Sequence, residues 1–391
     1  MRDYKWTSGN EMKYVTEVLE NKHKDNPFCD RLERAVAKKY GVKYAISVNS
    51  GTSGLHAALV ACGVGDGDEV ITTPFTVFVD GSMAIMVGAK PVFADIDYKT
   101  HNIDPVEVES LITENTKAII PVSYHGLPYD IDAIMDIAER YGLYVIGDHA
   151  QSQLAKYNGQ YVGTKEHISM FSFERTKHVA CGEGGMLITN DAILAERARK
   201  FAGMGFKNLK ADTNEMAAIT PLSFQNPRYK RNDAIGLNYR LPELCSAVAL
   251  AQFERVEENV KLRQDIAKLY DGVFENYEYI FKPQSIPFGY THSYFTYAVK
   301  TKLNYDEWMR FHKFVISNGG DDFYAGMGLV YEEPYMAKNG YYLKWHGRCP
   351  TAEYIQPGLM QFKTNYRTLK EAKHVIDKLE WCISNYDHFK R

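Results

Sequence analysis

The stretch FSFERTKHVACGEGGMLITND, residues 171–191, joins two apolar runs through a loop that contains one lysine and a glycine cluster. The runs ISMFSF and GMLITN on either side are typical of buried strands. The lysine is Lys177, which follows Phe173 by four positions. A lysine in a loop is usually a solvated charge, so only the surrounding segments can give this one a chemical role.

Strand-like and helix-like segments alternate along residues 43–189. The strand candidates are KYAISVNS, EVITT, KPVFADI, KAIIPVSY, YVIGD, ISMFSF and GMLITN. The segments SGLHAALVAC, DIDAIMDIAERY and DAILAERARKFA carry apolar residues at helical spacing behind polar caps. This alternation predicts an α/β fold with a mostly parallel sheet sandwiched by helices. Ligands of such sheets bind at the carboxyl ends of the strands.

The pattern changes after residue 240. A long helical pattern, a strand candidate and two further helices follow, at residues 241–274, 293–301, 305–320 and 369–386. They predict a smaller C-terminal α+β domain. We therefore expect a large domain at residues 1–240 and a small domain at residues 241–391.

Composition excludes several classes of function. Of the 391 residues, 45% are hydrophobic and 24% charged, and the formal net charge of -3 argues against nucleic acid as a partner. The six cysteines show no C-x-x-C pair or metal-ligand spacing, which predicts reduced thiols, a cytoplasmic protein and no metal site. No apolar secretory signal or run of about 18 apolar residues is present, so we expect no membrane span.

Two further strand ends carry polar groups. In VNSGTSGLHAAL, the residues Gly51 and Thr52 begin a helix, whose free N–H groups suit a phosphate. The alternative is simply a capped helix after a tight turn. In VIGDHAQS, the residues Asp148 and Gln151 stand at the end of a strand, where the aspartate could also be only a cap.

A phosphate cradle, a carboxylate and a loop lysine together match the needs of pyridoxal phosphate (PLP). That cofactor uses a lysine for its Schiff base, an acid to keep its ring nitrogen protonated and an anion site for its phosphate. A nucleophilic lysine must also lose its proton near neutral pH, which burial and a neighbouring cation promote. Lys177, Asp148 and the helix start at Gly51 supply the three groups.

The sequence resembles the DegT/DnrJ/EryC1/StrS family of PLP-dependent sugar aminotransferases. The resemblance runs from about residue 27 to residue 255 through the segments NSGTSGLHAAL, GDEVITTPFTVF, GAKPVFADID, GDHAQ, FSFERTKHVACGEGGMLITND and IGLNYRLPELCSAVALAQFERVE. Several motifs in order are more specific than any one of them. The resemblance implies the aspartate-aminotransferase fold, PLP fold type I, in a homodimer with shared active sites.

The resemblance also implies roles for individual residues. Lys177 would bind the cofactor covalently and move the substrate proton, Asp148 would pair with the ring nitrogen, and Gln151 would reach the phenolic oxygen. The phosphate would be held by the backbone of Gly51 and Thr52, by the hydroxyl of Ser172 and, from the partner subunit, by Asn238.

Three positions depart from the family pattern. Val77 stands where we expect an aromatic ring stacked on the cofactor, so either Phe78 replaces it or the stacking is weaker. His149 replaces a small residue and either stacks on the ring or packs in the core. The segment QPGLMQFKTNYR, residues 356–367, stands where we expect a proline-leucine-histidine element.

These features predict an aminotransferase that moves an amino group from an amino acid, with glutamate the expected donor, to a keto group of a nucleotide-linked sugar in surface polysaccharide biosynthesis. The alternatives are a small phosphorylated ketone as acceptor, or a non-catalytic regulatory protein on the same fold. A basic loop between Lys207 and Arg231 follows the lysine motif. In it, Arg228, Lys230 and Arg231 are either solvated charges or contacts to a phosphate of the acceptor.

Overall fold

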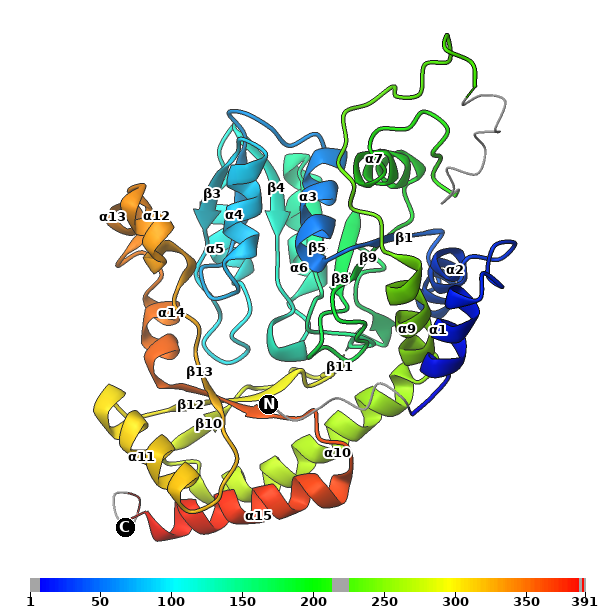
Figure 1. Cartoon of the computed structure of the whole chain (residues 1–391). Helices are drawn as coiled ribbons and strands as arrows, with labels where there is room; N and C mark the ends of the chain where they lie inside the picture. The colour runs from blue at the N-terminus through cyan, green and yellow to red at the C-terminus, as the bar shows by residue number, and fades with distance from the viewer. Residues whose placement is uncertain (1–7, 213–224, 387–388, 390–391) are drawn as a thin grey trace.

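The structure is a computed structural model that describes residues 8–212, 225–386 and 389 (Figure 1). A seven-stranded sheet in the order β1-β9-β8-β5-β4-β2-β3 forms its largest part. These strands are β1 (Tyr44–Val48), β2 (Glu69–Thr72), β3 (Lys90–Phe93), β4 (Thr116–Ile120), β5 (Tyr144–Asp148), β8 (Ile168–Ser172) and β9 (Gly185–Thr189). Neighbours are parallel except that β9 is antiparallel to both β1 and β8. The prediction of a mostly parallel α/β sheet is confirmed.

Both faces of this sheet are covered because its strands carry apolar residues at consecutive positions, which point to opposite faces. In β5, Val145 packs into the core on one face and Ile146 into the core on the other. The helices along this part of the chain are α1 (Glu11–Leu19), α2 (Phe28–Tyr40), α3 (Gly51–Ala61), α4 (Val79–Met86), α5 (Pro105–Ser110), α6 (Ile131–Tyr141) and α7 (Ala192–Ala202). Apolar residues of α3, α4 and α7 share one core, and those of α2 and α6 share the other.

The long helical pattern at residues 241–274 forms two helices, α9 (Glu243–Phe253) and α10 (Val256–Phe274). The break falls at Arg255, whose φ of -115° and ψ of 14° are not helical. The guanidinium of Arg255 donates to the hydroxyl of Ser8 at 3.0 Å and to the carboxylate of Glu11 at 2.5 Å. Contacts with the N-terminal segment therefore accompany the interruption, and these contacts are not visible in helical periodicity.

The C-terminal region contains a four-stranded antiparallel sheet in the order β10-β12-β14-β13. Its strands are β10 (Phe281–Pro283), β12 (Thr296–Thr301), β13 (Tyr324–Ala325) and β14 (Leu359–Lys363), and its helices are α11 (Tyr305–Ser317), α12 (Pro334–Lys338), α13 (Tyr341–Trp345), α14 (Pro350–Ile355) and α15 (Leu369–Asn385). In Figure 1, α10 runs from α9 along this region beside α15.

Two hydrophobic cores follow from this arrangement. Phe274, Phe281, Phe311 and Phe362 belong to a core of the C-terminal sheet and its helices. Apolar residues of α9, α12 and α14 instead pack with the large sheet. The division at residue 240 stays a prediction, and side-chain packing crosses it.

A small third sheet joins the two regions, since β11 (Tyr290–Thr291) pairs with β6 (Lys156–Tyr157), which also pairs with β7 (Gln160–Tyr161). Among the described residues, no helix is both long enough and apolar enough to span a membrane.

Candidate active site

Lys177 lies in a loop that leaves strand β8 and returns in strand β9. The loop is folded onto the strand, because the N–H of Phe173 donates to the carbonyl oxygen of Gly184 at 2.8 Å. A side chain at Gly185 would place its Cβ 2.8 Å from the carbonyl oxygen of Ser50. The glycine therefore allows the lysine loop to rejoin the sheet directly against the segment that precedes α3.

Two side chains of α10 hold the backbone of the lysine loop. The Asn259 amide donates to the carbonyl oxygen of His178 at 3.1 Å. The Arg263 guanidinium donates to the carbonyl oxygens of Thr176 at 2.9 Å and of Lys177 at 3.2 Å. The helix that follows the large sheet thus fixes the position from which the lysine side chain projects. Neither residue could be assigned from sequence, because in a helical pattern both read as polar surface positions.

The lysine side chain is partly buried and carries a perturbed amine. Lys177 Nζ lies 4.0 Å from the centroid of the Phe295 ring. The pKa of Lys177 is lowered to about 8, mainly by burial; the carboxylates of Asp148 and Glu174 oppose this shift, and the positive charge of Arg263 adds to it. An amine of this kind loses its proton close to neutral pH, as a nucleophile requires.

Asp148 ends strand β5 with its carboxyl group buried, at 2% exposure. The N–H of Ala150 donates to Asp148 Oδ1 at 2.8 Å. Burial raises the pKa of Asp148, while the Ala150 N–H, a hydrogen bond with Asp80 and the charge of Lys177 favour its ionised form. The structure thus places Asp148 and Lys177 in one electrostatic environment, and adds Asp80, which sequence reasoning missed.

Gln151 lies three residues beyond Asp148 with its amide orientation fixed. Its Oε1 accepts a hydrogen bond from the backbone N–H of His125 at 2.7 Å. His125 is buried and has a φ of 60°, an unusual conformation that directs this N–H. With the oxygen occupied, the NH₂ of Gln151 remains as the group that can donate to a ligand.

The residues expected to bind phosphate meet at the start of α3. The Ser50 hydroxyl accepts from the N–H of Ser53 at 3.1 Å and caps the helix. The first N–H groups, at Gly51 and Thr52, have no acceptor within the helix itself. A Cβ at Gly51 would lie 3.4 Å from the Ser172 hydroxyl, so helix start and hydroxyl are adjacent. This geometry suits an anion.

Asn238 lies apart from the buried groups, on the exposed surface of the chain. Its segment pairs with two other segments: Asn238 bridges to Gly203, and the N–H of Asn49 donates to the carbonyl oxygen of Tyr239 at 2.7 Å. These contacts bring the segment close to the start of α3. The Asn238 side chain nevertheless stays exposed, to solvent or to another subunit.

The three basic residues Arg228, Lys230 and Arg231 are exposed as well. Part of their loop, residues 213–224, lies outside the described residues. The N–H of Lys207 donates to the carbonyl oxygen of Arg231 at 2.9 Å, so the two ends of the loop are joined. The structure does not bring these side chains into the group around Lys177.

The aromatic positions near residue 77 give no clear stacking partner. Val77 is partly buried, and Phe78 is 37% exposed with an edge contact to Tyr335 at 6.4 Å between ring centroids. Stacking of Phe78 on the cofactor ring therefore stays a prediction.

His149 is packed in the core, which is the second of the two alternatives for this residue. Its Nδ1 is hydrogen-bonded to the Ser123 hydroxyl at 2.9 Å and its Nε2 to the Glu166 carboxylate at 2.8 Å. The ring is fully buried and lies parallel to that of Tyr129. Both ring nitrogens are therefore used inside the protein.

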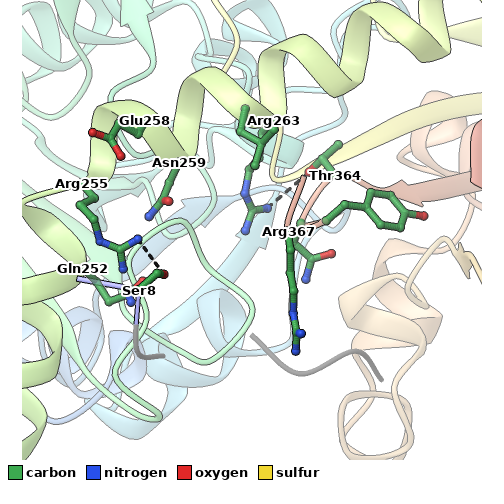
Figure 2. Close-up of a pocket in the computed structure, with 11 residues that line it drawn as sticks. Ser8, Gln252, Arg255, Glu258, Asn259, Arg263, Thr364 and Arg367 are labelled. Atoms are coloured by element: carbon green, nitrogen blue, oxygen red, sulfur yellow. Dashed lines mark hydrogen bonds between the residues drawn. The ribbon is translucent and has the colours of Figure 1, made fainter. Parts of the chain in front are cut away.

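A pocket of about 300 Å³ lies next to the elements that anchor the lysine loop (Figure 2). Arg263 and Asn259 project into it from α10, and Thr364 and Arg367 border it after β14. Lys177 and Asp148 are not among its lining residues. This hollow is therefore separate from the group of side chains around the lysine amine.

Comparison with known proteins gives consistent matches. The model of the DegT/DnrJ/EryC1/StrS aminotransferase family matches residues 7–380. GDP-perosamine synthase of Escherichia coli O157:H7 is 34% identical over 298 residues, 75% of this chain and 76% of that protein. The spore coat polysaccharide biosynthesis protein SpsC of Bacillus subtilis (strain 168) is 37% identical over 266 residues, 68% of this chain and 66% of that protein. The solved aminotransferase from Psychrobacter cryohalolentis is 27% identical with a TM-score of 0.86, over 98% of this chain and 99% of that chain.

Proposed function

This chain belongs to the DegT/DnrJ/EryC1/StrS aminotransferase family, and we propose that it transfers an amino group from glutamate to a keto group of a nucleotide-linked sugar. The enzyme is a PLP-dependent aminotransferase that acts on small molecules. The finer assignment is supported by the names of two relatives, a GDP-perosamine synthase and a spore coat polysaccharide biosynthesis protein. We therefore place the acceptor in surface polysaccharide biosynthesis.

One observation carries the chemical part of the proposal, namely the partly buried amine of Lys177 beside the buried Asp148 carboxylate. The residues present fit PLP: an amine with a lowered pKa, a carboxylate for a ring nitrogen, and a helix start beside a serine hydroxyl for a phosphate. When bound, the cofactor supplies an electron sink for the carbon that gains or loses a proton.

The proposal gives each residue a role toward the cofactor. Lys177 would hold the cofactor covalently, and its free amine would move the proton to and from the substrate carbon. Asp148 would keep the ring nitrogen protonated, and the NH₂ of Gln151 would donate to the phenolic oxygen. The backbone N–H groups of Gly51 and Thr52 bind the phosphate.

Two further contacts to the same phosphate complete the proposed site. The Ser172 hydroxyl approaches from the end of β8, and Asn238 approaches from the second subunit of a homodimer. The exposed position of Asn238 is compatible with a partner's site, since its side chain is not used in the core of its own chain. Donor and acceptor then use one site in turn, in a ping-pong reaction.

The lowered pKa makes Lys177 suitable for proton transfer. With a pKa of about 8, roughly a tenth of the free amine is unprotonated at pH 7, far more than for an ordinary lysine. The same amine still returns a proton readily, because its pKa lies near the working pH.

The experiment that tests the acceptor has two stages. The holoenzyme is first converted by glutamate to its amino-loaded form and freed of excess donor. It is then mixed with nucleotide-linked keto-sugars or with small keto-phosphates, while the absorbance of the lysine-bound cofactor is followed. We expect its return with a nucleotide-linked keto-sugar and not in a Lys177→Ala control. Return with small keto-phosphates alone would contradict the sugar assignment and favour the other acceptor class.

A further inference from the structure

Asp80 is a buried carboxyl group beside Asp148. It lies in the first turn of α4 with no exposed surface, and the Asp148 carboxyl group is close enough to raise the pKa of Asp80. The Thr76 hydroxyl donates to Asp80 Oδ2 at 2.7 Å. The remaining oxygen, Asp80 Oδ1, is buried and receives no donor from any described residue.

Two carboxyl groups in contact inside a protein cannot both be ionised, so the pair holds a proton. The surroundings decide where it resides. Asp148 accepts the N–H of Ala150 and faces the charge of Lys177, both of which stabilise a carboxylate. Asp80 accepts a hydrogen bond from one neutral hydroxyl and lies near the Asp148 carboxyl group and the Tyr124 side chain, although its place in the first turn of a helix favours its charge slightly.

We propose that Asp80 is a neutral carboxylic acid that donates its proton to Asp148, and so orients the Asp148 carboxylate and keeps it charged for the ring nitrogen. Asp80 is a positioning residue, because it acts through Asp148 and not on the reacting atoms. The inference rests on the proposed role of Asp148. Burial and the adjacent carboxylate both raise the pKa of Asp80 well above its usual value, in agreement with this assignment.

The first test detects the neutral acid itself. Infrared difference spectra between wild-type holoenzyme and Asp80→Asn at neutral pH should show the loss of one carbonyl band of a protonated carboxylic acid. A matched control is Asp95→Asn. The Asp95 carboxylate is also buried, but it accepts three backbone N–H groups and should therefore lose a carboxylate band instead. Loss of a carboxylate band in Asp80→Asn would overturn the proposal.

The second test measures the effect on the cofactor. Asparagine at position 80 can still donate to Asp148 and accept from Thr76, so Asp80→Asn should change PLP affinity by about threefold at most. Leucine has a similar size but no donor, so Asp80→Leu should bind PLP roughly tenfold to a hundredfold more weakly.

The ¹⁵N chemical shift of the labelled PLP ring nitrogen should change in Asp80→Leu and stay the same in Asp80→Asn. Equal losses of affinity in both variants would contradict a donor role. If Asp80→Leu does not fold, the infrared comparison of Asp80→Asn still decides the proposal. Neither readout depends on the acceptor, and covalent mapping of Lys177 reports separately on the proposed site.

Discussion

Arg263 should determine how firmly the lysine loop is held. This arginine is 3% exposed, and its guanidinium donates to the carbonyl oxygens of Thr176, Lys177 and Phe295 at 2.9, 3.2 and 3.0 Å. It also donates to the Thr364 hydroxyl at 3.4 Å. The substitution Arg263→Met keeps most of the side-chain volume but removes every one of these donors.

The expected size of the effect follows from the two bonds to the loop itself. A hydrogen bond from a charged donor contributes about 1.5–3 kcal/mol, so two of them contribute about 3 kcal/mol at the lower end. A loop held less tightly by about 3 kcal/mol opens roughly a hundredfold more often. Amide hydrogens of residues 174–182 should exchange faster by the same factor in Arg263→Met.

Hydrogen–deuterium exchange of the holoenzyme, read by mass spectrometry on peptides from this loop, measures the effect directly. The control is Lys261→Ala on the same helix, where the side chain is exposed and forms an ion pair with Asp265 one turn away. That control should leave the loop unchanged. Arg263→Lys should be intermediate, since an ammonium cannot reproduce the planar fork. Acceleration of less than about threefold in Arg263→Met would refute the reasoning.

Three further predictions concern charge and assembly. With the cofactor removed, the rate at which the Lys177 amine reacts with acetic anhydride should rise with pH, with a midpoint near pH 8. Below this pH the unreactive protonated form dominates, and above it the reactive neutral amine dominates. A midpoint near 10.5 would show that burial does not lower the pKa of Lys177. Mixed dimers of inactive Lys177→Ala and Asn238→Ala subunits should recover activity through one intact site, whereas verified mixed dimers without activity would count against a shared site. Alanine at Arg228, Lys230 or Arg231 should lower the catalytic efficiency of the acceptor half-reaction alone, by roughly tenfold to a hundredfold where the residue binds phosphate. Equal losses of efficiency in both half-reactions would exclude such a contact.

The sheet could be predicted from sequence because its determinants are local. Every one of the seven strand candidates between residues 43 and 190 is a strand of the large sheet. The capped helices expected in this part of the chain also form, as at Asp130 before α6 and Asp191 before α7. The antiparallel insertion of β9 between β1 and β8 was not predicted, because strand order depends on pairing over long distances.

The positions of the candidate site residues in the sheet could also be predicted, whereas their roles stay a prediction. Motif order placed Lys177, Asp148 and the helix start at Gly51 at the ends of strands, where the structure has them. Arg263 and Asp80 were missed for a physical reason: in sequence one reads as the solvated face of a helix and the other as an ordinary acid in a first turn. Their roles arise only from contacts that tertiary packing creates.

The position of the covalently bound cofactor tests the proposed role of Lys177 most directly. Borohydride reduction of the holoenzyme fixes the cofactor to its lysine, and peptide mapping then identifies that residue. We expect the pyridoxyl group on Lys177, in the loop between β8 and β9. A pyridoxyl group on Lys165 or Lys156 would contradict the proposed role of Lys177, because neither residue lies in the loop that Arg263 and Asn259 hold.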